Sequence, residues 1–378
     1  MQTQNPKSLY TACMLNWLLI LVPVAFVLEF FVHPGQVWIF VVSAAAILPL
    51  AGLMGKATEE LAARTGATIG GLLNATFGNA TELIIAFFAL QAGKFDVVKA
   101  SITGSIIGNL LLVLGLAVFL GGLKYPKQTF NRDSAGTAAS LLIISVIAFL
   151  IPALFDVAEK QFGISSSQIK IDDANLALGV SFVLLALYAA NIVFTLITHK
   201  DLLSTSDEAE SEHHVTEWSV PVALGVLLVS TIFVGFMSEF LVSSIEGFTK
   251  AFGLSEFFVG LIIIPIVGNA AEHASAVVFA LKNRMELAVT IAIGSTVQVA
   301  LLVAPILVIL SWIIGKRMDL VLNNPLEIVT LIGAVLIGNS VTRDGETNWL
   351  EGFMLLGVYV ILALAFFLLP NPPGVVHN

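Results

Sequence analysis

Long apolar runs follow one another along almost the whole chain, and short polar stretches separate them. A membrane-spanning helix needs roughly 20 predominantly apolar residues. By this measure the pattern predicts eleven spans, and therefore an all-α polytopic membrane protein with eleven transmembrane helices. The predicted spans are 15–33, 36–56, 66–92, 98–121, 134–155, 175–199, 217–243, 254–281, 286–314, 325–342 and 348–370.

The first apolar run, Leu15 to Val32, could in principle belong to a signal peptide. It is longer than the apolar region of a cleavable signal, and no small-x-small cleavage site follows it. We therefore expect it to be a true span that lies outside the rest of the pattern.

Composition supports a membrane protein and excludes several other classes. Of the 378 residues, 57% are hydrophobic and 11% are charged, and the mean hydropathy is +0.96. A soluble domain would carry about a quarter charged residues. The net charge of −9 argues against a nucleic-acid partner, and the single cysteine, Cys13, cannot form an intramolecular disulfide. No Cys/His cluster suggests zinc or iron–sulfur ligation, so we expect no resident cofactor.

The basic residues of the connections predict the orientation of the chain. Ten Lys and Arg residues lie on the side that holds the N-terminus, and seven lie on the other side. Basic residues are enriched in cytoplasmic loops. The count therefore favours a cytoplasmic N-terminus and an external C-terminus.

Two similar motifs lie inside apolar runs: "GNATELIIA" begins at Gly78, and "GNAAEHASA" begins at Gly268. Each carries one glutamate, Glu82 or Glu272. Further along, "GSIIGNLLLVLG" begins at Gly104 and "GSTVQVALLVAP" begins at Gly294, so the second pair of stretches has the same offset as the first. The chain therefore contains an internal duplication.

The acidic residues upstream of these motifs are also paired. "ATEEL" contains Glu59 and "MSEFL" contains Glu239, at an offset slightly shorter than that of the motifs. Spans 2–6 and 7–11 thus resemble two copies of one five-helix unit. Because five is odd, the second copy must cross the membrane in the opposite sense, which predicts inverted repeats.

The duplication divides the chain into five predicted parts. Residues 1–35 form the N-terminal tail and span 1, and residues 201–216 form an acidic cytoplasmic linker. The first five-helix repeat covers 36–200, the inverted second repeat covers 217–370, and 371–378 form the C-terminal tail.

Placing a glutamate in the middle of a membrane span raises the free energy of insertion by roughly 2.5–3.5 kcal/mol. It persists where it faces a polar cavity and meets a cation or a proton. Asn79 and Glu82 are three residues apart and share one helix face, as do Asn269 and Glu272. The glycines before them, together with Pro265, weaken the helix and expose backbone carbonyls.

Two carboxylates, two amide oxygens and free carbonyls form an all-oxygen site, which suits Ca²⁺ better than Mg²⁺ or a soft metal. Burial and a second nearby carboxylate also favour the protonated form of each glutamate. One cavity that holds either Ca²⁺ or protons predicts an exchanger with alternating access. The purely structural alternative is that each glutamate bonds to a neighbouring helix and only stabilises the packing.

Other polar residues have both a functional and a structural interpretation. His273 could carry a proton or be a packed core histidine, and Glu59 and Glu239 could serve gating and proton access or lie at the interface. The residues expected either to line the cavity or to join helices are Ser105, Asn109, Ser295 and Gln298. Those expected to be solvated helix ends are Glu60, Glu246, Glu256 and Glu286.

The linker "SDEAESEHH" is either a solvated acidic stretch or a strip that senses or attracts cations. Its acidic residues are Asp207, Glu208, Glu210 and Glu212.

The paired stretches "GNATELIIAFFAL" and "GNAAEHASAVVFALKNRMELAVTIAIGSTVQVALLVAP" closely resemble the two signature repeats of calcium/proton exchangers, in the cation/calcium antiporter superfamily. The resemblance runs from span 2 to span 11 and implies a fold of one plus five plus five helices. It implies that Glu82 and Glu272 are the central calcium ligands, with backbone oxygens near Gly78 and Gly268 contributing.

The resemblance extends to the remaining candidate residues. The polar residues of spans 4 and 9 would complete the cavity, and Glu59 and Glu239 match acidic positions on gating helices. The acidic linker matches a cytosolic acidic segment with a calcium-sensing role. Because the chain lacks the long N-terminal tail of plant members, it resembles a compact prokaryotic exchanger of the cell (inner) membrane that exports cytosolic Ca²⁺.

Three rival functions stay open at this stage. A sodium- or potassium-coupled calcium exchanger would have the same fold, although its sodium-coupled relatives carry a Ser/Thr- and Pro-containing pattern at the repeats. A calcium channel more often builds its filter from subunits around an axis. An intramembrane hydrolase finds no support, because the sequence has no His-Glu-x-x-His pair, and we expect no enzyme activity.

The expected partners are Ca²⁺, H⁺ and the lipid bilayer. The oligomeric state stays open, and a homo-oligomer is possible.

Overall fold

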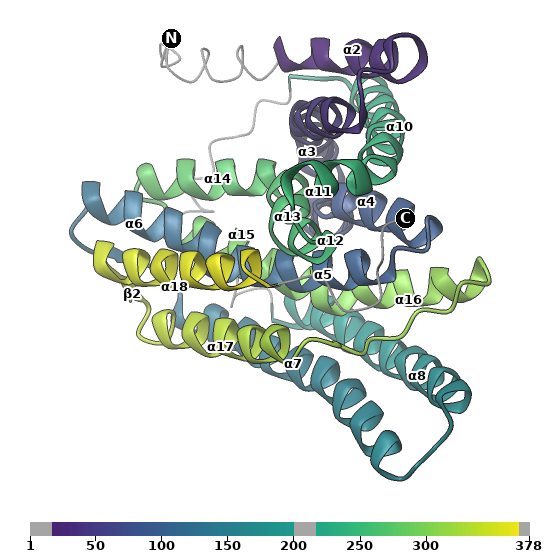
Figure 1. Ribbon diagram of the computed structural model, residues 1–378. Coiled ribbons are helices and arrows are strands. Elements are labelled where there is room, and N and C mark those ends of the chain that lie inside the picture. Colours follow the sequence, from purple (N-terminus) through teal and green to yellow (C-terminus); the bar gives the residue numbers. More distant parts are fainter. Residues whose placement is uncertain (1–16, 200–216, 370–378) are drawn as a thin grey trace.

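The computed structural model describes residues 17–199 and 217–369, apart from the side chains of residues 66–68 and 75. Over these ranges the chain is almost wholly helical (Figure 1). The elements of the first half are η1 (Leu18–Ile20), α2 (Leu21–Val27), η2 (Leu28–Val32), α3 (Gln36–Phe77), α4 (Ala80–Gln91), α5 (Phe95–Ile107), η3 (Gly108–Val113), α6 (Leu114–Lys124), β1 (Gln128–Thr129), α7 (Arg132–Gln161), α8 (Ser166–Val193) and η4 (Phe194–Thr198).

The second half repeats much of this order. Its elements are α10 (Val220–Ser243), α11 (Ile245–Phe252), α12 (Glu256–Phe258), η6 (Val259–Ile263), α13 (Ile264–Gly268), α14 (Ala270–Leu281), α15 (Met285–Gln298), η7 (Val299–Val303), α16 (Ala304–Ile313), α17 (Pro325–Val341), β2 (Glu346–Thr347) and α18 (Trp349–Phe367).

Seven helices within the described residues are long and apolar enough to cross a membrane. The count becomes eight if Ile245–Phe252 and Glu256–Gly268, which meet at a bend of 114°, form one span. Shorter apolar helices are Leu18–Val32, Ala80–Gln91, Ala270–Leu281 and Pro325–Val341. The prediction of an all-helical membrane protein is therefore confirmed, whereas the count of eleven is finer than this test resolves.

The polar interval predicted between spans 2 and 3 is helical and does not interrupt the helix. The sequence pattern ends one span at residue 56 and begins the next at residue 66, but α3 continues without a break from Gln36 to Phe77. The intervening "KATEELAAR" is rich in Ala, Leu, Glu and Lys, which all favour a helix, and it contains no proline. Its charges interrupt the apolar run without ending the helix.

The most buried helices are the continuous runs α5–η3–α6 and α15–η7–α16. In their most apolar windows, 72% and 67% of the residues are buried, against 17–44% in the other long helices. Contacts between the halves come in corresponding pairs: α14 packs against α6 and α4 against α16, while α18 packs against α6 and α8 against α16. The two halves therefore interleave around these two central runs.

Polar residues in the connections fix where several peripheral helices begin. The Asn131 side chain accepts hydrogen bonds from the first-turn amides of α7, Asn324 does so for α17, and Asn348 forms a capping box with Glu351 at α18. Each cap satisfies amides that lack an intrahelical partner. In front of two of these helices, β1 pairs antiparallel with β2 and joins the two halves at one end of the bundle.

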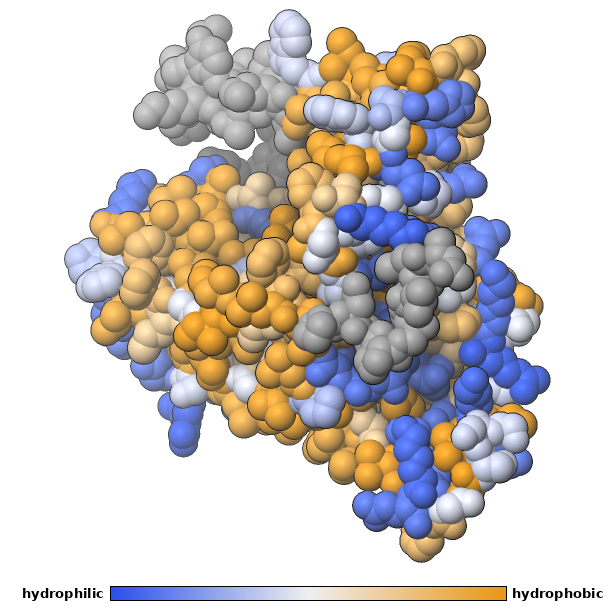
Figure 2. Space-filling model, viewed as in Figure 1, coloured by the Kyte–Doolittle hydropathy of each residue, from blue (hydrophilic) through white to orange (hydrophobic). Residues whose placement is uncertain are grey.

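The surface agrees with a membrane environment. Figure 2 shows apolar side chains over much of the visible face, with hydrophilic ones gathered toward the lower right, where the α7–α8 hairpin projects in Figure 1. On α8 only 17% of the most apolar window is buried inside the protein. Because a soluble monomer rarely exposes such large apolar patches, these surfaces suit contact with lipid.

Candidate functional site

The site begins at two matched interruptions of the helices. α3 ends at Phe77 and α4 begins at Ala80, and Asn79 between them has φ −100° and ψ 20°. In the second half Asn269 separates α13 from α14, with φ −91° and ψ 10°. The predicted weakening of the helix at both motifs is therefore present, and Glu82 and Glu272 follow in the first turns of α4 and α14.

Each glutamate packs against the glycine of the opposite motif. A β-carbon added at Gly268 would lie 3.1 Å from Cγ of Glu82, and one added at Gly78 would lie 3.8 Å from Oε1 of Glu272. The two carboxyl groups also interact electrostatically with each other. The glycines thus leave room for the carboxyl groups of the other half at the centre of the molecule.

Both asparagines of the motifs bond to the opposite half. The Ser295 hydroxyl donates to Oδ1 of Asn79 at 3.0 Å, and Nδ2 of Asn269 donates to the Ser105 hydroxyl at 3.1 Å. Ser105 and Ser295 themselves occupy corresponding positions of the duplicated stretches. The duplicated Asn and Ser therefore form two reciprocal bridges between the halves.

The first of these bridges is more extensive. Asn79 also donates through Nδ2 to Oε1 of Gln298, and Nδ2 of Asn109 donates to the Ser295 hydroxyl at 3.0 Å. The residues at the corresponding positions, Gly108 and Val299, cannot make such side-chain bonds. The site therefore departs from the symmetry of the sequence motifs.

Five buried side-chain oxygens around these bridges have no hydrogen-bond partner within the described part of the chain. They are Oε1 and Oε2 of Glu82, Oε2 of Glu272, Oδ1 of Asn109 and Oδ1 of Asn269. Buried polar atoms are nearly always paired, so a group of unpaired oxygens marks a place that can accept a cation, protons or water. Since all five are oxygens, they suit a hard cation such as Ca²⁺.

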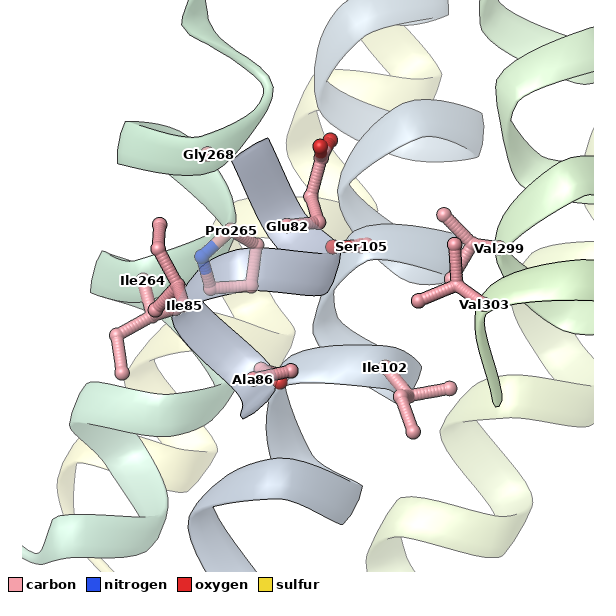
Figure 3. A pocket seen from close by; sticks show the side chains of 11 residues that line it. Glu82, Ile85, Ala86, Ile102, Ser105, Ile264, Pro265, Gly268, Val299 and Val303 are labelled. Carbon is pink, nitrogen blue, oxygen red and sulfur yellow. The ribbon is translucent and has the colours of Figure 1, made fainter. Parts of the chain in front are cut away.

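A small cavity lies beside Glu82, and Figure 3 shows its lining. Ser101 and Ser105 provide hydroxyl groups, but most of the wall is apolar; its apolar residues are Ile85, Ala86, Ile102, Ile264, Pro265, Val299 and Val303. The Glu82 carboxylate points away from Ile85 and Ala86 in this view (Figure 3). The carboxylate therefore stands at one end of an otherwise weakly polar space.

The two central helices carry π-helical turns at corresponding places, η3 at Gly108–Val113 and η7 at Val299–Val303. Each follows the polar cavity residues of its own helix, Ser105 in α5 and Ser295 in α15. Such turns are rare and often lie at functional sites. Their matched location adds a second distorted segment to each half beside the breaks at Asn79 and Asn269.

The other predicted residues lie elsewhere. Glu59 on α3 and Glu239 on α10 are exposed, and a gating role for them stays a prediction. His273 is half-buried on α14. The acidic stretch of Asp207, Glu208, Glu210 and Glu212 falls outside the described residues.

Sequence reasoning missed the burial of several charged residues, among them Glu60, Lys99 and Glu327. Glu60 is not a solvated helix end: its carboxylate accepts hydrogen bonds from the backbone amides of Glu217 and Trp218, at 3.1 and 3.3 Å. Glu327 on α17 bonds to the Thr103 hydroxyl, and the Lys99 ammonium bonds to Asp319 at 3.0 Å. All three lie near predicted span ends, where burial depends on a partner segment that is remote in sequence.

Comparison with known proteins identifies related chains. The family described as "Sodium/calcium exchanger protein" matches residues 35–197 and 222–368. The Ca²⁺/H⁺ antiporter of Aphanothece halophytica is 45% identical over 370 residues, covering 95% of this chain and 97% of that protein. The Ca²⁺/H⁺ antiporter ChaA of Bacillus subtilis (strain 168) is 47% identical over 339 residues, covering 89% and 94%.

Solved structures agree with these matches. The structure of native YfkE is 43% identical and has a TM-score of 0.79, covering 93% of this chain and all of that one. The crystal structure of the H⁺/Ca²⁺ exchanger CAX has a TM-score of 0.69 at 16% identity and covers 94% and 91%. The second comparison shows similarity of fold alone.

Proposed function

The chain belongs to the sodium/calcium exchanger protein family, and we propose that it works as a secondary active antiporter that exchanges Ca²⁺ for H⁺ across a membrane. The observation that carries this function is the group of five unpaired buried oxygens, contributed by Glu82 and Asn109 from one half and Asn269 and Glu272 from the other. The relatives named as Ca²⁺/H⁺ antiporters, at 45% and 47% identity, support the same activity.

In this proposal Ca²⁺ is the cargo, held mainly by the carboxylates of Glu82 and Glu272. The amide oxygens of Asn79 and Asn269 and backbone oxygens near Gly78 and Gly268 complete the coordination. Ca²⁺ takes six to eight oxygen ligands in flexible geometry, so a mixed set of carboxylate, amide and carbonyl oxygens suits it. Ser105, Ser295 and Gln298 hold the two asparagines in position, and Asn109 holds Ser295 and leaves its own Oδ1 free for the cation.

Protons compete with Ca²⁺ for the same carboxylates. Two dehydrated carboxylates that lie close together repel one another, and either a divalent cation or protons relieve that repulsion. A cavity that opens alternately to the two sides then couples inward movement of protons to outward movement of Ca²⁺. The exchanger would thereby export cytosolic Ca²⁺ at the expense of the proton gradient.

For the architecture we propose eleven spans, arranged as one N-terminal helix followed by two inverted five-helix repeats. The repeats would cover 36–200 and 217–370, joined by the acidic cytoplasmic linker 201–216, with the N-terminus cytoplasmic and the C-terminus external. The corresponding helix breaks and cross-half contacts support this arrangement. The two separate matches of one family, at 35–197 and 222–368, support it too.

Three further roles complete the proposal. Glu59 and Glu239 would act on the helices α3 and α10, which pack along each other, in gating or proton access. His273, next to Glu272, would carry protons or tune selectivity. The acidic residues 207–212 would sense cytosolic calcium.

Calcium-45 uptake into everted vesicles tests the function directly. A pH gradient is imposed in sodium-free and potassium-free buffer, and the unaltered chain is compared with Glu82→Gln and Glu272→Gln. We expect uphill uptake by the unaltered chain and loss of uptake in both variants. The matched control is Asp133→Asn, which neutralises an exposed carboxylate at one end of α7.

Each alternative predicts a different result in this assay. A channel would equilibrate calcium without accumulating it, and a sodium-coupled or potassium-coupled exchanger would stay silent until its ion was added. Substantial exchange by either glutamine variant would refute the assigned role of that glutamate.

A further inference from the structure

Glu327 is a buried carboxyl group outside the central site, and it contacts α5, a central helix of the first half. It lies in the first turn of α17, with 2% of its surface exposed. The Thr103 hydroxyl lies 2.5 Å from Oε1 of Glu327, whereas its distances to the carbonyl oxygens of Lys99 and Ala100 are 3.1 and 3.2 Å. A hydroxyl carries one hydrogen. The shortest contact therefore assigns that hydrogen to Glu327, and the bond joins α5 to α17.

Packing alone does not account for this pair of residues. Burial of a carboxyl group costs free energy, and one hydrogen bond to a hydroxyl recovers only part of that cost. Two apolar side chains would hold the same two helices together without it. A hydrogen bond differs from an apolar contact because it has a direction, so the bond between Thr103 and Glu327 fixes how far along α17 the helix α5 stands.

This bond lies on the side of α5 that faces away from the central cavity. Ser101 and Ser105 line the cavity, and Thr103 is not among the described residues that do so (Figure 3). Residues two apart in an α-helix point about 200° away from each other. One turn before Thr103, the Lys99 ammonium donates to the Val321 carbonyl at 2.9 Å. Polar contacts with the second half therefore support α5 from behind at two places.

The neighbouring residues of α5 are packed closely against the second half of the chain. A β-carbon added at Gly104 would overlap the carbonyl oxygen of Leu261 and lie 2.7 Å from Cγ of Pro265. One residue further on, the Ser105 hydroxyl accepts a hydrogen bond from Nδ2 of Asn269, which also donates to the Pro265 carbonyl at 2.9 Å. A displacement of α5 at this level would therefore move Asn269 as well.

We propose that Glu327 is a positioning residue of the central site. Through the Thr103 hydroxyl it fixes α5 along its axis, and Ser105 in the same turn then holds Asn269 in place. Residues 103 and 105 share one turn of a helix, so an axial shift at the first reaches the second. Asn269 carries one of the unpaired oxygens of the site. The role rests on the proposed function, because Asn269 is a proposed ligand of the calcium cargo.

Calcium binding to the purified chain in detergent, measured by titration calorimetry, tests this role. Glu327→Met removes the acceptor of the bond, and we expect the calcium affinity to fall about fivefold. The unfolding temperature should not fall, because the change removes a buried carboxyl group and the Thr103 hydroxyl can turn to the Lys99 carbonyl. A purely structural role predicts a lower unfolding temperature instead. Glu327→Gln keeps an acceptor oxygen and should restore the affinity of the unaltered chain.

The other side of the bond provides a second and independent variant. Thr103→Val removes the donor and should lower the calcium affinity about as much as Glu327→Met, whereas Thr103→Ser keeps the donor and the affinity. The double variant Thr103→Val/Glu327→Met should bind no more weakly than either single variant, since both remove one contact. The matched control is Thr330→Val, because the buried Thr330 hydroxyl on α17 has no hydrogen-bond partner among the described residues.

Three results would overturn the positioning role. Unchanged affinity in both Glu327→Met and Thr103→Val would show that the bond does not position the site. Equal losses in Glu327→Gln and Glu327→Met would show that the carboxyl group itself binds calcium or a proton. Additive losses in the double variant would show that the two residues act separately. The calorimetry needs no transport, so an unaltered chain that binds calcium without exchanging it for protons would refute the proposed function and leave the comparison of variants standing.

Discussion

The side chain of Glu82 lies against the backbone of Gly268, so closely that a β-carbon on that glycine would be 3.1 Å from Cγ of the glutamate. The two residues come from opposite halves of the chain and belong to corresponding motifs. The glycine of each motif therefore serves the glutamate of the other motif, in addition to weakening its own helix.

Gly268→Ala should weaken calcium binding while leaving the chain folded. Overpacking a well-packed position costs roughly 1–3 kcal/mol, so we expect the apparent calcium affinity to fall about fivefold or more. The measurement is the calcium dependence of calcium-45 uptake. The matched control is Gly294→Ala, since a β-carbon there meets no atom within 4 Å. Equal affinities for both variants would show that the contact with Glu82 does not matter.

Ser295→Ala should lower the apparent calcium affinity more than removal of the neighbouring Thr296 hydroxyl does. The Ser295 hydroxyl donates to Asn79 and accepts from Asn109, so its removal leaves two buried amides without these bonds. Each unsatisfied buried group costs roughly 1–3 kcal/mol, so we expect at least about a tenfold loss of apparent calcium affinity.

The comparison variant is Thr296→Val, because the Thr296 hydroxyl bonds within its own helix to the Ala292 carbonyl. Its affinity for calcium in the uptake assay should stay close to that of the unaltered chain. If both variants lose affinity alike, the bridge between the halves is not what positions Asn79.

Asp319→Asn should destabilise the fold more than Lys99→Met does. The Lys99 side chain is 8% exposed, so without Asp319 its buried ammonium keeps only the Val321 carbonyl at 2.9 Å and the more distant Asp96 at 3.7 Å. Asp319 is 37% exposed, so water can hydrate it when Lys99 is removed. Removing one partner of a fully buried ion pair lowers the free energy of unfolding by roughly 3–5 kcal/mol. Because this pair is only partly buried, the loss caused by Asp319→Asn should not exceed that range. Unfolding temperatures in detergent give the order, and the reverse order would contradict this account of the pair.

The sequence alone determined the membrane class, the duplicated motifs and the pair Glu82 and Glu272. Apolar length and composition decide whether a helix can lie in a bilayer, and a charge inside such a helix stands out against its neighbours. The constant offset between the duplicated motifs also predicted the matched helix breaks, because glycine and proline act locally.

Only the tertiary structure decided which residues meet across the halves. The bond of Asn79 to Gln298, which has no counterpart at Gly108, and the burial of Glu60 under Glu217 and Trp218 depend on segments from the other half of the chain. Periodicity along a chain records the environment of one helix, whereas hydrogen bonds and charge contacts depend on how helices pack, and that arrangement exists only once the chain has folded.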